Sequence, residues 1–124
     1  MPSSYTIDPA KRLVRTRTWG KLTEAETWAH YDKLRHDPAF QPTFRQVCDL
    51  REVIELEAST DFLKALAKQT VFARGTRRAY VVTSDLHFGL ARMLAAYAEA
   101  EGSEIGVFRT MEEAEGWLGE GVGR

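Results

Sequence analysis

One short apolar run, AYVVT at residues 79–83, constrains the fold more than any other feature of this sequence. It follows two charged residues, Arg77 and Arg78, and it precedes two polar residues, Ser84 and Asp85. A run of this length without polar alternation is typical of a strand buried on both faces, as the strands of parallel sheets are. The sequence therefore indicates an α/β fold, in which helices cover both sides of a largely parallel sheet.

The rest of the chain supplies the other elements of such a sheet. Apolar residues bounded by turn residues predict four more strands, at residues 5–7, 13–19, 44–50 and 105–108. Helical apolar spacing and capping residues predict four helices, at residues 23–36, 86–101 and 110–118 and from Ser59 onward, with residues 52–58 as a linker. The order is β-β-α-β-α-β-α-β-α. Because a hairpin opens the chain and crossovers follow, we expect a mixed, mostly parallel sheet flanked by helices.

Chain length sets the domain organisation. The 124 residues leave room for one domain, and no repeat or linker interrupts them. We expect a single domain over residues 1–124, with its core at about 5–118 and a loose, glycine-rich tail at 119–124. A core of this size leaves little space for a large internal cavity.

Charge and composition exclude several classes of partner. A net charge of −1 offers no electrostatic basis for binding nucleic acid. No apolar stretch approaches the roughly 20 residues that cross a bilayer, and the first residues lack a secretory signal, so no membrane insertion is expected. The single cysteine, Cys48, lies in an apolar context and is expected to be buried and reduced. These features predict a soluble, cytoplasmic protein.

Charge is nevertheless unevenly placed along the chain. Basic residues without acidic neighbours gather in the first hairpin, at Lys11, Arg12, Arg15, Arg17 and Lys21. Acidic residues dominate the last third, at Glu99, Glu101, Glu104, Glu112, Glu113, Glu115 and Glu120. The charges could simply protect an exposed sheet edge. Alternatively, the two regions contact a regulatory protein partner or a second copy of the chain, and we expect a homodimer.

The sequence contains no catalytic constellation. The three histidines, His30, His36 and His87, lack the spacing and the partners of a metal site, and we expect them to be solvated. Asp49 could act as a base, but no nucleophile motif accompanies it, so a structural hydrogen bond to a neighbouring loop is expected. The sequence predicts a protein that is not an enzyme and has no cofactor or metal.

Four stretches resemble a known family. They lie at residues 5–8 with 13–14, 37–38 with 44–53, 84–86 with 88–93, and 107–109 with 112–114 and 117–118. Together they are similar to the SpoIIAA-like or STAS/Sec14-like small bacterial domains, over nearly the whole chain. The resemblance implies the SpoIIAA-like (STAS-like) fold and a non-enzymatic, cytoplasmic role as a protein-interaction or regulatory module. Its Sec14-like members suggest an alternative, a carrier or sensor of a small apolar or anionic ligand.

The resemblance also singles out Ser59. In the anti-sigma-factor antagonists a serine at this position, within Asp-Ser-Ser-Gly, is phosphorylated by a partner kinase. Here Glu57, Ala58 and Thr60 replace the residues around it. A β-branched residue in place of the glycine hinders positive φ and close approach of a kinase. We therefore expect Ser59 to cap the second helix, with a phosphosite as the alternative.

A ligand or partner site is a further hypothesis, at the carboxyl ends of the parallel strands. Free N–H groups and helix dipoles favour anions there. The polar residues expected toward this edge are Arg51, Ser59, Thr60, Ser84, Asp85 and Thr110. Three features oppose an anion: the sequence has no glycine-rich phosphate loop, Asp85 adds negative charge, and Arg51 could pair with Glu52 or Glu55.

Gly89 suggests a second place for such contact. Glycine inside a helix costs about 1 kcal/mol relative to alanine, so its missing side chain should serve close packing. The helix either packs tightly on the sheet there or admits a ligand or partner, with His87, Phe88 and Arg92 around the glycine. The aromatic residues Trp19, Trp28, Phe62, Phe72, Phe88 and Tyr97 are expected to fill the core rather than line a pocket.

Overall fold

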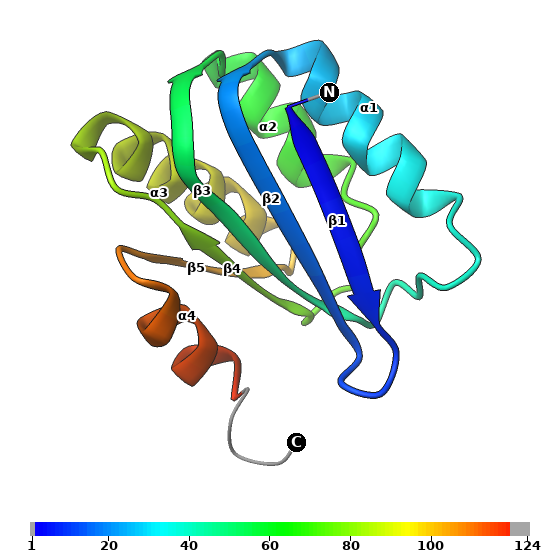
Figure 1. Cartoon of the computed structure of the whole chain (residues 1–124). Helices are drawn as coiled ribbons and strands as arrows, with labels where there is room; N and C mark the ends of the chain where they lie inside the picture. The colour runs from blue at the N-terminus through cyan, green and yellow to red at the C-terminus, as the bar shows by residue number, and fades with distance from the viewer. Residues whose placement is uncertain (1, 120–124) are drawn as a thin grey trace.

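The computed structural model describes residues 2–119, and its centre is one five-stranded sheet in the order β1-β2-β3-β4-β5 (Figure 1). The strands are β1 (Ser3–Asp8), β2 (Leu13–Leu22), β3 (Arg45–Leu56), β4 (Arg77–Val81) and β5 (Glu104–Phe108). The helices are α1 (Glu24–Arg35), α2 (Thr60–Lys68), α3 (Asp85–Ala100) and α4 (Met111–Leu118). Only β1 and β2 pair in antiparallel fashion, so the sheet is mixed and mostly parallel. The predicted element order and fold class are confirmed.

Helices cover the two faces of the sheet unequally. Figure 1 shows α1, α2 and α3 behind the sheet and α4 alone in front of it, beside β4 and β5. Strand β4 joins both layers, because Tyr80 belongs to the large core under α1–α3 while Ala79 and Val81 pack with Ala114 of α4. The run at residues 79–83, which predicted a strand buried on both faces, therefore forms a strand with a packed core on each face.

The capping residues set where each helix begins. The Thr23 side chain accepts a hydrogen bond from the backbone N–H of Glu26, whose carboxylate in turn accepts from the Thr23 N–H, which completes the predicted capping box. The side chains of Ser59, Ser84 and Thr110 cap α2, α3 and α4 by accepting one backbone hydrogen bond each, without the reciprocal bond of a capping box. Each bond satisfies a donor that the helix itself leaves free.

The third strand differs from its prediction. We expected it to end at residue 50, with a linker over 52–58, but β3 continues to Leu56. The continuation is paired with β2, which itself extends to Leu22, opposite Leu56. The pairing continues through two register shifts, between Arg17 and Trp19 and between Gly20 and Lys21. Gly20, at the second shift, has a left-handed backbone conformation with φ of 68°. Pairing with a distant strand, not local composition, decides the length of β3.

The other boundaries lie close to expectation. Strand β4 ends at Val81, two residues before the predicted end. Helix α4 ends with Gly119 in the left-handed conformation, and the rest of the predicted tail lies outside the described residues. Within residues 2–119, no helix has the length and apolar character that crossing a membrane requires.

Candidate functional site

A cavity of about 60 Å³ lies between the sheet and the three helices that cover it. Side chains from β1, β2, β3 and β4 form its floor, and side chains from α1, α2 and α3 form its roof. Most of the lining is apolar, as at Leu50, Phe62 and Leu94. We call this hollow the inner cavity. Its small volume agrees with the expectation that no large cavity fits in a chain of this length.

Two hydroxyl groups in the inner cavity have no hydrogen-bond partner. The side chains of Ser3, on β1, and Thr18, on β2, both line it. Their oxygen atoms are shielded from solvent, and no described residue bonds to either of them. Leaving a buried polar group without a partner costs roughly 1–3 kcal/mol. Such groups in a native protein call for an explanation, and a molecule bound in the cavity would supply one.

A chain of buried polar side chains adjoins these hydroxyls. The Nε2 atom of His30, in α1, lies 3.3 Å from the hydroxyl oxygen of Thr16. The same oxygen accepts a hydrogen bond of 3.0 Å from the side-chain amide of Gln46. The phenol of Tyr31 donates to Gln46 and lies 3.1 Å from that of Tyr80. Burial, assisted by the charge of Lys33, lowers the pKa of His30 to about 4. The imidazole is therefore neutral at pH 7, with one donor and one acceptor nitrogen, and its Nε2 is already in contact with Thr16.

The expectation of solvated histidines is wrong for two of the three. His30 and His87 are buried and line the inner cavity, whereas His36 is exposed at the end of α1. The imidazole of His87 makes no hydrogen bond with any residue in the 2–119 range. Sequence reasoning missed this placement because the buried face of α1 carries Thr27, His30 and Tyr31. One pattern in the sequence could have indicated a polar interior here: in β2, Thr16 and Thr18 alternate with Arg15 and Arg17, so the two threonines share the face opposite the arginines.

Gly89 does not serve close packing against the sheet, which corrects one of the two explanations offered for it. It is exposed, and a Cβ atom added there would meet nothing within 4 Å. The residues next to it point in different directions. His87 lines the inner cavity, whereas the ring of Phe88 packs against Arg109, whose guanidinium carbon lies 4.3 Å from the ring centre. Arg92 lies 6.0 Å from the same ring. The structure thus does not gather these residues around one point.

The residues predicted at the carboxyl edge are also held apart by partners within the chain. Arg51 makes a double hydrogen bond with Asp49, at 2.9 Å for each contact, instead of pairing with Glu52 or Glu55. This contact holds the pKa of Asp49 below its usual value. Arg109 donates a single hydrogen bond to Asp85, beside the cap of α3, and another to the backbone carbonyl of Thr83. Asp49 thus makes an ion pair on its own strand, and the expected bond to a neighbouring loop is absent from the described residues.

Ser59 occupies a helix cap, as expected. Its hydroxyl oxygen accepts a hydrogen bond of 3.1 Å from the backbone of Phe62, and its own N–H donates to Glu24. Glu57 accepts from the backbone N–H of Glu24, so the beginnings of α1 and α2 are tied together. Thr60, the first residue of α2, is exposed. A phosphate on Ser59 would lie beside the carboxylates of Glu24 and Glu57, which disfavours it.

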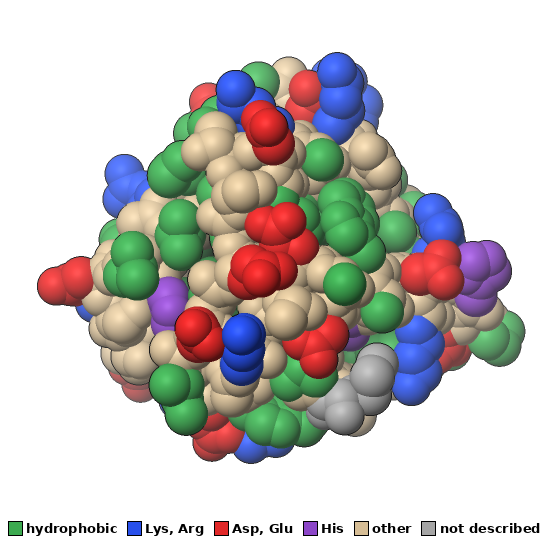
Figure 2. All heavy atoms as spheres, turned by 90° about the horizontal axis from the view of Figure 1, so that it is seen from above, with side chains coloured by type: hydrophobic (Ala, Val, Ile, Leu, Met, Phe, Trp, Pro, Cys, Tyr) green, Lys and Arg blue, Asp and Glu red, His purple; other side chains and the backbone are tan. Residues whose placement is uncertain are grey.

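The surface around these caps is acidic. Figure 2 looks down on this edge and shows acidic side chains gathered near the middle, with hydrophobic side chains beside them. The exposed Ile54 and Leu86, at 85% and 70% exposure, belong to β3 and to the start of α3. Negative charge at this edge makes it unsuitable for the anion that the helix N-termini alone would favour.

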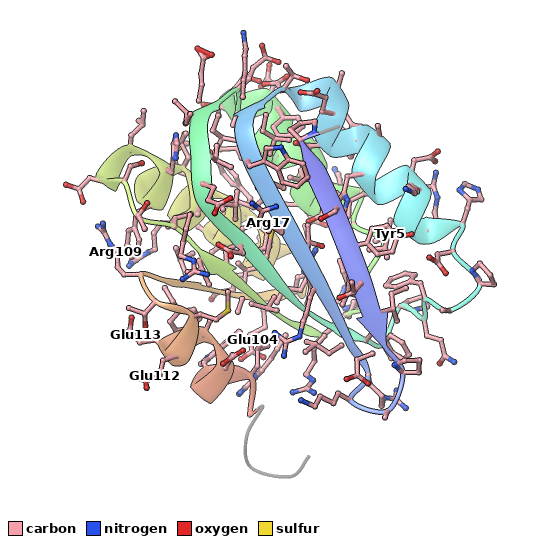
Figure 3. All side chains as sticks on the ribbon, in the orientation of Figure 1. Tyr5, Arg17, Glu104, Arg109, Glu112 and Glu113 are labelled. Atoms are coloured by element: carbon pink, nitrogen blue, oxygen red, sulfur yellow. The ribbon has the colours of Figure 1, made fainter. Side chains whose placement is uncertain are left out.

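The face of the sheet that points away from α1–α3 is charged. We call it the open face, because α4 covers it only beside β4 and β5. Figure 3 shows Arg17 on this face, in front of β2 and β3, and Glu112 and Glu113 on α4. Arg17 pairs with Glu52 and stacks 4.7 Å from the ring centre of Trp19. The basic hairpin and the acidic end of the chain were predicted to contact a partner or a second copy. The structure shows one such contact within the molecule, where Arg15 pairs with Glu115 at 3.3 Å.

No group of three His, Cys, Asp or Glu side chains in the described part of the chain could hold a metal ion. The buried Cys48 is a free thiol, and burial raises its pKa to about 12, so it is protonated at pH 7. Thr16 and His30 pair a hydroxyl with an imidazole, but none of the described carboxylates orients the imidazole as a catalytic triad requires. This arrangement suits binding better than nucleophilic chemistry.

Comparison with known proteins agrees with the architecture. No family model and no curated protein matches the sequence. Among solved structures, the chain is similar to an uncharacterised protein of the DUF3478 family from Shewanella loihica PV-4, described as having a SpoIIAA-like fold. The TM-score is 0.60 at 22% identity, and the match covers 94% of this chain and 93% of that one. The five-stranded mixed sheet with its four helices is therefore a SpoIIAA-like fold.

Proposed function

We propose that this protein is a non-enzymatic binding module, a carrier or sensor whose small ligand enters the inner cavity between the sheet and α1–α3. The observation that carries the proposal is the pair of unpartnered hydroxyls of Ser3 and Thr18 in a hollow whose lining is mostly apolar. Apolar walls with a few convergent polar groups are typical of small-molecule sites. The buried, reduced Cys48 supports a cytoplasmic setting.

The size of the cavity limits the ligand. An engineered apolar cavity of about 150 Å³ binds benzene, whereas this one measures about 60 Å³. It therefore admits a molecule, or the end of a longer one, of only a few heavy atoms. The free hydroxyls, each of which can donate and accept, select a group that both donates and accepts hydrogen bonds, such as an alcohol or an amide. The ligand class is a small, mainly apolar molecule with one such group.

Native mass spectrometry of the protein purified from its own cells tests this proposal. We expect an additional small mass that denaturation releases, and we expect the Ser3→Ala, Thr18→Val double variant to lose it. Thr16→Val is the matched control, because the Thr16 hydroxyl already has partners inside the chain. A bare wild-type mass would contradict the carrier function. A phosphate on Ser59 would instead indicate a regulatory switch.

A second candidate function, a regulatory protein-interaction module that acts as a homodimer, is favoured by the edge strand β5. Among the described strands β5 pairs only with β4, so its other backbone edge faces outward. A groove of about 780 Å³ follows this edge between α3 and α4, with Ile105, Val107 and Trp117 in its lining. An unpaired, partly apolar edge can add a strand from a second copy.

Light scattering across a concentration series tests the dimer directly. A dimeric mass at tens of micromolar supports pairing of this kind, and a monomeric mass at that concentration contradicts it. The measurement also separates the two functions, because occupancy of the inner cavity does not require the β5 edge.

A further inference from the structure

Arg78 is the one arginine in the described chain that is almost completely buried, at 3% exposure. It lies in β4, between Gln46 of β3 and Ile105 of β5, and its side chain points to the side of the sheet that α1–α3 cover. Sequence reasoning treated it as a polar boundary of the strand. The structure instead places a guanidinium, which is charged at every physiological pH, inside the protein.

Two of the three nitrogen atoms of this guanidinium have no acceptor among the described residues. Its Nε and Nη2 atoms are shielded from solvent, and no described residue accepts a hydrogen bond from either of them. Its one favourable contact is with the ring of Phe72, whose centre lies 5.0 Å from the guanidinium carbon. A cation–π contact offsets only part of the desolvation of a charge, and buried charges are otherwise paired. The site therefore lacks one negative, hydrogen-bond-accepting group.

A groove opens beside Arg78. It measures about 470 Å³ and runs between α1 and the end of α2. Trp28, Ala29, Leu66 and Val71 give it apolar walls. Asp32 and Arg35 also line it, but they pair with each other at 2.5 Å, so the charge of Arg78 remains uncompensated.

We propose that this groove binds a small organic carboxylate, whose acid group pairs with Arg78 and whose apolar body lies along Trp28. The planar fork of a guanidinium matches the two oxygens of a carboxylate. A single negative charge balances Arg78, whereas a dianionic phosphate would add repulsion from Asp32. The groove shares Tyr31 and Leu66 with the inner cavity but is a separate hollow. The inference therefore stands independently of the proposed function.

Calorimetric titration and thermal unfolding with benzoate, hexanoate and benzamide test the inference. We expect benzoate or hexanoate to raise the unfolding temperature and to bind at millimolar or lower concentration. Benzamide, which has the shape of benzoate without its charge, should do neither. If neither acid binds, or if benzamide binds as well as benzoate, the inference is wrong.

Variants of Arg78 separate a binding function from a structural one. Arg78→Lys keeps the charge but loses the fork, so benzoate affinity should fall about tenfold or more. Arg78→Met fills the same space without charge and should abolish binding while leaving the ligand-free protein at least as stable. Arg77→Met, at the preceding position of β4, is the matched control and should retain the affinity, because Arg77 is exposed, pairs with Glu104 and does not line the groove. Unchanged benzoate affinity in Arg78→Met, or a large fall in its unfolding temperature, would overturn the inference.

Discussion

The polar side chains on the two faces of the sheet differ in whether they have hydrogen-bonding partners. On the open face Arg17 and Arg51 have carboxylate partners on β3, in Glu52 and Asp49. On the face that α1–α3 cover, a guanidinium and two hydroxyls are buried without partners. Water can complete the bonding of an exposed group but not of a buried one. This difference is the reason why we propose ligand sites on the covered face, although the open face carries more charge.

Truncating a buried side chain on the covered face should have the largest effect. Leu34 of α1 is 0% exposed, so Leu34→Ala should lower the free energy of unfolding by about 3 kcal/mol, through lost burial and the cavity left behind. The same change at the exposed Leu86 should cost less than about 0.5 kcal/mol. Urea unfolding of the two variants checks this, and equal losses would contradict the assigned burial.

Acid should weaken the covered face through His30. Its pKa is about 4 in the folded protein against 6.5 for an ordinary histidine, so the unfolded chain binds this proton more tightly. Stability is therefore complete above pH 6.5 and falls as the pH decreases toward 4, by about 3 kcal/mol in all. Urea unfolding at several pH values should show this loss. His30→Gln should flatten the profile between these pH values and His36→Gln should not; an unchanged profile in the first variant would refute the assignment.

A matched pair of threonines sharpens the comparison within one strand. Thr18→Val removes a buried hydroxyl without a partner and should raise the free energy of unfolding by about 1 kcal/mol in the absence of ligand. Thr16→Val removes a hydroxyl bonded to Gln46 and should lower it by about the same amount. Chemical denaturation of both proteins decides the matter, and changes of the same sign would refute the assigned bonding.

The smallest effect is expected on the open face. Arg51→Gln breaks the contact with Asp49, but both groups are partly exposed, and such pairs contribute about 0.5 kcal/mol. The loss should shrink further in high salt, because screening weakens surface charges. Denaturation at low and high salt measures it, and a loss as large as that of Leu34→Ala would show that the open face is not solvated as described.

Local patterns predicted the fold better than the site. The run at 79–83 and the caps at Thr23 and Ser59 act through neighbours in the sequence, so they could be recognised there. The length of β3 depends on pairing with β2, which no local pattern contains. Arg78 resembles any charged residue at a strand end, and its burial depends on Phe72 and on the groove beside α1. The polar groups that suggest ligands lie where distant segments meet.

The sheet order has a consequence for how the molecule is made. Each strand lies next to the strand that precedes it in the chain, so a chain growing from a ribosome can add one strand at a time to a finished edge. The roof of the inner cavity is completed only by α3, whose Leu90, Ala91 and Leu94 line it. Until α3 is synthesised the hollow stays open, and a ligand present during translation could be enclosed as the protein folds.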